Sequence, residues 1–353
     1  MTALKGKVPD DHVGRAESAV VILQSEPGAE LKGLLRSAGL SYLLLHGLHP
    51  DWSVLPVSPS LTPYCEPIPA SVGAPIHVIW SCSDPDLTPQ NVLRHLASGH
   101  ELLAAMGRSV KRILENKVVK YGMVRAIEAF IMEYVRTRTG INIPRVHLVF
   151  QQAGCTYIVM DYVRGRTLKD LWPSFDENER RARGSQVADI IAQLRALPPD
   201  DRPGPPDRGA ESGPSVELRC EGKWFSDYGA GPFSSHQELA AWLNKMLSSS
   251  RGSKAHGPIF ESSNPLVFTH QDLAARNVIL DDAGCIWVID WELAGWYPEY
   301  FEYACIAADT TVPRGWTDAV LAHIQPYEKE YRMLQSLRWV LSGSSSRERR
   351  KRA

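Results

Sequence analysis

The chain has 353 residues, 44% of them apolar and 22% charged, which is the composition of a globular protein long enough to bury a large core. Its 39 basic and 40 acidic side chains nearly balance, so no bulk field attracts nucleic acid or an anionic membrane. The longest apolar run, residues 40–48, is far shorter than the roughly 20 residues of a membrane span, and scattered cysteines without a signal pattern predict a reduced, cytoplasmic compartment.

The N-terminal segment, residues 1–84, shows no consistent period and is interrupted repeatedly by proline between Pro50 and Pro75. We expect irregular structure there, and its function stays open. The chain changes character after Asp84, because Thr88 followed by Pro89 is typical of a capped helix start. The domain proper is therefore predicted to begin near residue 84.

The next stretch predicts a β-hairpin followed by an amphipathic helix. Residues 110–114 and 117–121 flank Glu115-Asn116, and the second of these strands carries Lys120. Apolar residues then recur at helical spacing from 127 to 135, on a helix that carries Glu128 near its start. Lys120 and Glu128 can therefore form an ion pair, whereas the competing Glu133 falls on a different face of the helix.

Two further strands are predicted at residues 143–150 and 155–163, before a short link and a helix opened by Thr167 and Asp170. Helices predicted after Ser174 and after Ser235 make the following region mainly helical. The basic run at 347–352 could be a nuclear address or a phosphate-binding patch, but a solvated, disordered end is favoured.

A second hairpin, within residues 267–292, concentrates the side chains with chemical potential. The β-prone runs 278–280 and 285–289 are separated by a turn-rich spacer, which places Asn277 and Asp290 symmetrically about the turn. Cross-strand partners lie about 5 Å apart, so these two side chains could share a hard cation such as Mg²⁺. Asp272 lies on the loop entering the first strand, where it could orient a hydroxyl group; the alternative is that it caps a helix or a turn.

The motifs His270-Gln-Asp-Leu-Ala-Ala-Arg-Asn277, Ile289-Asp-Trp-Glu292 and Ala294-Gly-Trp-Tyr-Pro-Glu-Tyr-Phe-Glu-Tyr303 resemble the aminoglycoside phosphotransferase and choline kinase family, in its branch common in fungi. The resemblance extends over roughly residues 85 to 340. The family commonly has glycine where this chain has Gln271 and proline where it has Ala275, and neither departure removes a catalytic group.

This resemblance implies an α+β, two-lobed protein-kinase-like fold. A small nucleotide-binding lobe at 85–163 would combine an antiparallel sheet with one helix, a larger, mainly helical lobe at 164–340 would carry the catalytic hairpin, and residues 341–353 would form the tail.

The resemblance also implies roles for individual residues. Asp272 would accept or orient the proton of the acceptor hydroxyl, and Asn277 and Asp290 would hold Mg²⁺. Lys120, positioned by Glu128, would steady the α- and β-phosphates of ATP.

Supporting roles follow from the same comparison. His270 and Arg276 would brace the catalytic loop. The backbone of Asp161 to Val163 would face the adenine edge, with Met160 and Val163 in apolar contact, although Met160 could equally be a core residue. No Gly-x-Gly-x-x-Gly loop precedes Lys120, so the sequence assigns no individual group there to the phosphates.

The resulting hypothesis is a monomeric, ATP- and Mg²⁺-dependent phosphotransferase acting on a hydroxyl group of a small molecule. A protein kinase is disfavoured, because the chain runs from Asp290 to a predicted helix at 300 without a long activation segment. A catalytically silent nucleotide-binding scaffold is the other alternative. The acceptor is open: Glu292, Glu299 and Glu302 could attract a cationic amine or be ordinary solvated residues.

Overall fold

A computed structural model describes residues 20–23, 41–44, 75–82, 84–105, 107–206, 218–225, 229–248 and 260–338. The chain divides into two compact units, Met1–Tyr64 and Cys65–Ala353. In the first unit, strands β1 (Val20–Leu23) and β2 (Ser41–Leu44) pair in parallel. The rest of that unit and the predicted basic tail lie outside the described residues.

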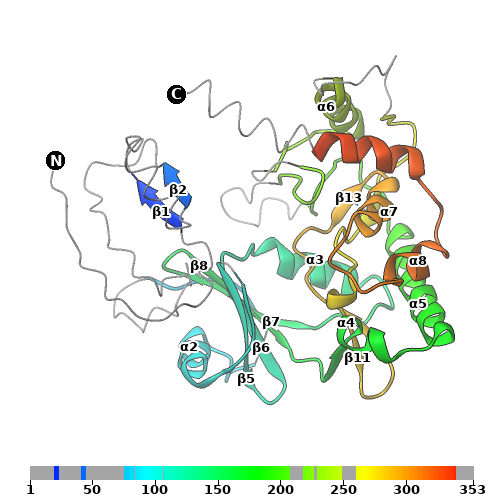
Figure 1. The fold of residues 1–353 in the computed structure, drawn as a ribbon. Helices are drawn as coiled ribbons and strands as arrows, with labels where there is room; N and C mark the ends of the chain where they lie inside the picture. Colours follow the sequence, from blue (N-terminus) through cyan, green and yellow to red (C-terminus); the bar gives the residue numbers. More distant parts are fainter. Residues whose placement is uncertain are drawn as a thin grey trace, which may run out of the picture. The chain divides into compact units, whose positions relative to one another are not determined.

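The second unit opens with a six-stranded antiparallel sheet in the order β3-β7-β8-β6-β5-β4. Strands β5 to β8 of this sheet are labelled in Figure 1. Its strands are β3 (His77–Ser81), β4 (His100–Ala105), β5 (Arg108–Leu114), β6 (Lys117–Gly122), β7 (Val146–Gln152) and β8 (Cys155–Asp161). The hairpin predicted around Glu115-Asn116 is β5 and β6. The sequence did not predict β3 or β4, and β3 adds to the sheet a strand that precedes the boundary expected near residue 84.

The two faces of this sheet are covered by different helices. Helix α2 (Pro89–Ser98), capped by Thr88 as predicted, packs Val92 and Leu96 against one face. Helix α3 (Ile127–Arg136) packs against the other face, in a core that continues into the helical part of the unit. Alternation along β6 places Val119 in the α2 layer and Val118 in the α3 layer. Lys120 therefore points to the α3 side.

The large lobe is mainly helical, and it carries the second hairpin. Its helices are α4 (Leu168–Leu171), η1 (Trp172–Ser174), α5 (Glu177–Arg195), α6 (His236–Ser248), α7 (Tyr300–Ala307) and α8 (Trp316–Leu321), and residues 328–338 are also helical. Helix α5 begins at a capping box made by Asp176 and Glu179, not at the predicted start at Ser174. The Asp176 side chain accepts the backbone N–H of Glu179, and the Glu179 side chain accepts the backbone N–H of Asp176.

Small sheets frame the predicted catalytic stretch. Strands β9 (Gly165–Thr167), β11 (Val278–Asp281) and β12 (Ile286–Val288) form one sheet, and β10 (Val267–Thr269) pairs with β13 (Gly295–Tyr297) in another. The short η3 (Ala275–Asn277) connects the loop after β10 to β11.

The predicted α+β class is confirmed: an antiparallel sheet with a helix precedes a mainly helical lobe that carries the hairpin. Within the described ranges, no helix has both the length and the apolar character that crossing a bilayer requires.

Candidate active site

The centre of the candidate site is the ammonium group of Lys120, on β6. Its Nζ lies 2.7 Å from Glu128 Oε2 and 2.6 Å from Asp290 Oδ1. Glu128 comes from α3, and Asp290 follows β12, so this cation joins the two lobes. Glu128 Oε1 also accepts the backbone N–H of Trp291 at 3.2 Å. The predicted pairing of Lys120 with Glu128 is present, and Glu133 is instead bound to Arg136 at 2.6 Å.

Burial and charge act on these groups in opposite directions. Burial alone would lower the pKa of Lys120, but Glu128, Asp290 and Glu292 together raise it above its ordinary value, so the ammonium stays charged at neutral pH. Burial raises the pKa of Glu128 to about 7 against the attraction of Lys120. Burial alone would raise the pKa of Asp290, but the attraction of Lys120 outweighs burial and lowers it.

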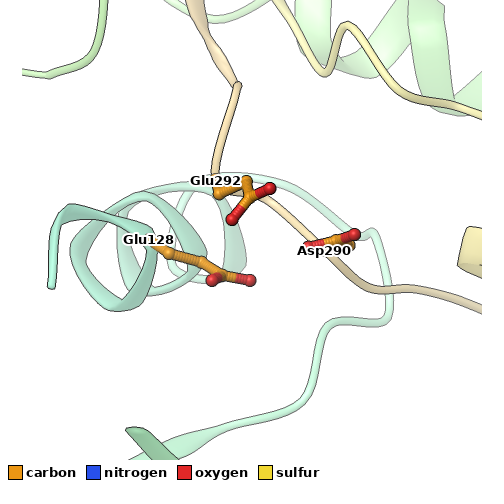
Figure 2. A group of neighbouring side chains, drawn as sticks. All are labelled: Glu128, Asp290 and Glu292. Atoms are coloured by element: carbon orange, nitrogen blue, oxygen red, sulfur yellow. The ribbon is translucent and has the colours of Figure 1, made fainter. Parts of the chain in front are cut away.

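Three carboxylates converge at this point. Oxygens of Glu128, Asp290 and Glu292 lie within 4.8 Å of one another. Figure 2 shows the side chain from α3 and the two from the segment after β12 turned toward a common space. Oxygen donors suit a hard divalent cation such as Mg²⁺. Lys120 lies among the three carboxylates and is bound to Glu128, so Asp290 and Glu292 are the members whose oxygens fit a metal.

Asp272, the candidate proton acceptor, lies in a second cluster with Arg276 and Asn277. Arg276 Nη2 donates to both carboxylate oxygens of Asp272, at 2.6 and 2.8 Å, and Asn277 Nδ2 donates to Asp272 Oδ2 at 2.7 Å. Arg276 also reaches Asp309 at 3.0 Å. Burial raises the pKa of Asp272, although Arg276 counteracts the shift. The carboxylate is thus fixed in orientation and remains a better proton acceptor than an exposed aspartate.

His270 stabilises the same loop through two hydrogen bonds. It is fully buried, and burial lowers its pKa to about 4, so the ring is neutral at pH 7. Its Nδ1 accepts the backbone N–H of Asp272 at 3.2 Å, which leaves the proton on Nε2 to be donated to the carbonyl of Ile289, also at 3.2 Å. One histidine therefore ties the Asp272 loop to the strand that leads into Asp290.

Glu302, on α7, also binds the backbone of this loop. Its side chain is 1% exposed, and its carboxylate accepts the backbone N–H groups of His270 at 2.5 Å and Gln271 at 3.2 Å. Burial raises the pKa of Glu302 to about 7. Sequence reasoning missed this role, although an acidic residue inside the apolar helix Tyr300–Ala307 was a signal for a buried carboxylate with a dedicated partner.

Of the three acidic residues considered for a cationic acceptor, Glu302 differs from both expectations, because it is neither solvated nor open to a ligand. Glu302 is buried on the loop, Glu292 is bound to Arg108, and Glu299 is bound to Arg195 at 2.9 Å. The side chains of Glu292 and Glu299 are 21% and 34% exposed, so a role of these two in binding an acceptor stays a prediction.

The expected symmetry of Asn277 and Asp290 is also corrected, by one residue. Val278 lies opposite Val288, and Ile289 donates its N–H to the carbonyl of Asn277, so Asn277 faces Ile289 across the hairpin. Asp290 follows in left-handed backbone, with φ 66°, which turns its side chain toward Lys120. The structure brings Asp290 to Lys120, while the amide nitrogen of Asn277 faces Asp272.

Gln271 is also left-handed, with φ 65°. Such a conformation costs about 1–2 kcal/mol for a residue with a side chain. The side-chain Nε2 of Gln271 donates to the carbonyl of Leu293 at 2.7 Å, a contact that offsets part of this cost and that glycine could not make.

The predicted adenine-facing segment follows β8. Met160 is buried in the core shared with α3. The Asp161 side chain accepts from Lys117 at 3.0 Å and His147 at 2.7 Å, bonds that lower its pKa to about 2 although burial opposes them. The backbone N–H groups of Asp161 and Tyr162 donate to carbonyls of residues 145 and 116. Val163 is half-buried beyond them.

Comparison with known proteins gives one family match. A family model described as the phosphotransferase enzyme family matches residues 124–339. No curated protein matches the chain.

Solved structures with some likeness include the aminoglycoside phosphotransferase APH(2'')-Ib bound to ADP, at 16% identity and a TM-score of 0.44 over 70% of this chain and 86% of that one. The aminoglycoside phosphotransferase APH(4)-Ia has 15% identity and a TM-score of 0.46, over 72% and 90% of the two chains. A putative fructosamine-3-kinase from Haemophilus somnus 129PT has 13% identity and a TM-score of 0.44, over 69% and 87%. The family model is the match on which an assignment can rest.

Proposed function

Because the chain belongs to the phosphotransferase enzyme family, we propose that it transfers the terminal phosphoryl group of ATP, with Mg²⁺, to a hydroxyl group of a small molecule. The observation that carries this proposal is the junction at Lys120, which binds Glu128 and Asp290 although Asp290 lies 170 residues away in the chain. Phosphoryl transfer needs charge neutralisation and positioning more than covalent help from the protein, and this junction supplies both.

On the nucleotide side, Lys120 would bind the α- and β-phosphates, and Glu128 would hold the ammonium in place. The N–H groups of Asp161 and Tyr162 already donate within the protein, so we assign the backbone contact with adenine to Val163. Met160, whose side chain is 8% exposed, would form part of the apolar floor under the ring.

The residues that would hold Mg²⁺ are Asp290 and Asn277. Asn277 turns its amide nitrogen toward Asp272, so its oxygen faces away from that carboxylate. Glu292, the third member of the carboxylate group at Asp290, offers a further oxygen. When bound, the metal would neutralise negative charge on the phosphates.

On the acceptor side, Asp272 would take the proton of the attacking hydroxyl at a carboxylate oxygen. Arg276 and Asn277 fix the orientation of that carboxylate, and His270 and Glu302 fix its loop. A small acceptor is favoured because only β13 separates Asp290 from α7, which begins at Tyr300. That interval is too short for the activation segment on which a protein kinase docks a peptide.

The test is a screen for acceptor-dependent ADP formation from MgATP, using aminoglycosides, choline-like amines, amino sugars and hydroxylated secondary metabolites. The matched control is Asp272→Asn, which keeps the size of the side chain and one acceptor oxygen but removes the carboxylate that would accept the proton. ADP release that depends on an acceptor and is lost in the variant would support the proposal. MgATP binding without acceptor-dependent turnover across the library would favour a silent nucleotide-binding protein.

A further inference from the structure

The turn that would cover the nucleotide phosphates is short. Strand β4 ends at Ala105 and β5 begins at Arg108, so two residues connect them. Gly107 has φ 77°, and its carbonyl accepts the backbone N–H of Met123 at 2.6 Å. A Cβ on Gly122 would lie 2.3 Å from that carbonyl oxygen. Gly107 therefore packs directly on the neighbouring strand, and a connection of two residues is too short to be the extended glycine-rich loop whose N–H groups cradle phosphates in many nucleotide-binding proteins.

The residue that follows this turn, Arg108, carries a positive charge. Arg108 lies opposite Gly122, and Val110 lies opposite Lys120. Directly opposed residues share a face of an antiparallel pair, and so do residues two apart along a strand. Arg108 and Lys120 therefore extend from the same face of the sheet, the face covered by α3.

Both cations meet the same carboxylates. Arg108 Nη1 is ion-paired with Glu292, and Lys120 with Glu128 and Asp290. Lys120 Nζ also lies 3.8 Å from Glu292 Oε2, so both cations lie beside that carboxylate. Burial opposes a raised pKa for Arg108, but Glu292, Asp290 and Glu128 together raise it. Two cations thus lie beside three carboxylates, and burial keeps one of these, Glu128, partly protonated near pH 7 by raising its pKa to about 7.

Glu292 can release Arg108 without moving its own backbone. Arg125 donates to the backbone carbonyl of Glu292 and is bound to Glu221 at 3.0 Å. The side chains of Arg108 and Glu292 are 33% and 21% exposed, so their pair lies at the solvent-facing edge of the cluster. A polyphosphate offers the guanidinium fork more negative charge and bidentate geometry than a single carboxylate.

We propose that Arg108 is a phosphate-binding residue that replaces the missing glycine-rich loop. In the free protein Arg108 is ion-paired with Glu292. When a nucleotide binds, the guanidinium leaves that carboxylate and binds the nucleotide's phosphates. The inference rests on the proposed function, since it requires a nucleotide at Lys120. The ligand chemistry is a nucleoside di- or triphosphate, recognised through its phosphates.

The experiment is calorimetric titration of the full chain and of Arg108→Ala with ATP, ADP and adenosine, each with and without Mg²⁺. Loss of one charge-assisted contact should weaken ATP and ADP binding about 10- to 100-fold and leave adenosine binding unchanged. The matched control is Lys111→Ala, which removes a cation from the opposite face of the same strand. Arg108→Gln, which keeps polar contact with Glu292, serves as a second variant if the alanine variant does not fold.

The outcomes separate the two proposals. If the wild-type chain binds ATP and both Arg108 variants bind it equally well, the role of Arg108 is refuted while the proposed function stands. If the Arg108 variants lose affinity for adenosine in parallel with affinity for ATP, Arg108 supports the fold of the small lobe and does not bind phosphates. If the wild-type chain binds neither ATP nor adenosine, the proposed function falls, and the role of Arg108 falls with it.

Discussion

Replacing Glu302 with glutamine should change how the stability of this protein depends on pH. The Glu302 carboxylate is 1% exposed and is held by two backbone N–H groups of the loop that carries Asp272. Those bonds favour the charged form, but burial disfavours it more, and the pKa rises from 4.5 to about 7. The native protein therefore retains a proton that the unfolded chain has lost between these two pH values.

The sign and size follow from proton linkage. Because the native state binds more protons between pH 4.5 and about 7, the free energy of unfolding falls as pH rises through that window. The stabilisation is fully present below pH 4.5 and is lost above about pH 7. A pKa difference of this size corresponds to about 3 kcal/mol. Glutamine does not titrate. The free energy of unfolding of Glu302→Gln, taken relative to that of the wild type, should therefore rise by about 3 kcal/mol from acidic to alkaline pH.

The assay is urea unfolding of both proteins at pH 5 and pH 8, compared as the difference between variant and wild type. Glu128, whose pKa also rises to about 7, is present in both proteins and cancels in that difference. Glu177→Gln, at an exposed position, controls for the loss of one negative charge. Parallel pH profiles for wild type and Glu302→Gln would show that the buried carboxylate is not protonated near neutral pH, and the reasoning would fail.

Three further outcomes are expected. Asp272→Asn should lower kcat by about 10²- to 10⁴-fold with unchanged calorimetric MgATP affinity, and wild-type turnover in this variant would remove Asp272 from the mechanism. Asp290→Ala should abolish the gain in ATP affinity on adding Mg²⁺, and a titration that still shows this gain would contradict a metal-holding role. A chain beginning at residue 85 should be less stable by about 2–4 kcal/mol than one beginning at residue 65, because it loses β3 and the packing of Ile79 and Trp80 against the α3 side. Equal urea midpoints would show that β3 contributes nothing to the stability of the small lobe, and would support the boundary near residue 84.

Local patterns were enough to predict the elements that carry the candidate site. The turn signal at Glu115-Asn116 and the spacer after β11 each specify a hairpin, because turn residues and alternation act between near neighbours in the chain. Helical spacing identified α3 and placed Glu128 toward Lys120. The offsets among Asp272, Arg276 and Asn277 are also local, since these residues lie within five positions of one another.

The tertiary structure decided which distant segments converge. Arg108 meets Glu292 across 184 positions, and Glu302 reaches the backbone of His270 across 32. Hairpin symmetry misplaced Asp290 by one residue, because the register of β11 and β12 sets Asn277 opposite Ile289. Asp290 then follows in left-handed backbone and contacts Lys120. Periodicity reports which residues share a face of one element, whereas contacts between loops depend on how the elements pack. The pairs Arg108–Glu292 and Lys120–Asp290 are of this second kind, since their members lie 184 and 170 positions apart and meet only after both lobes have folded.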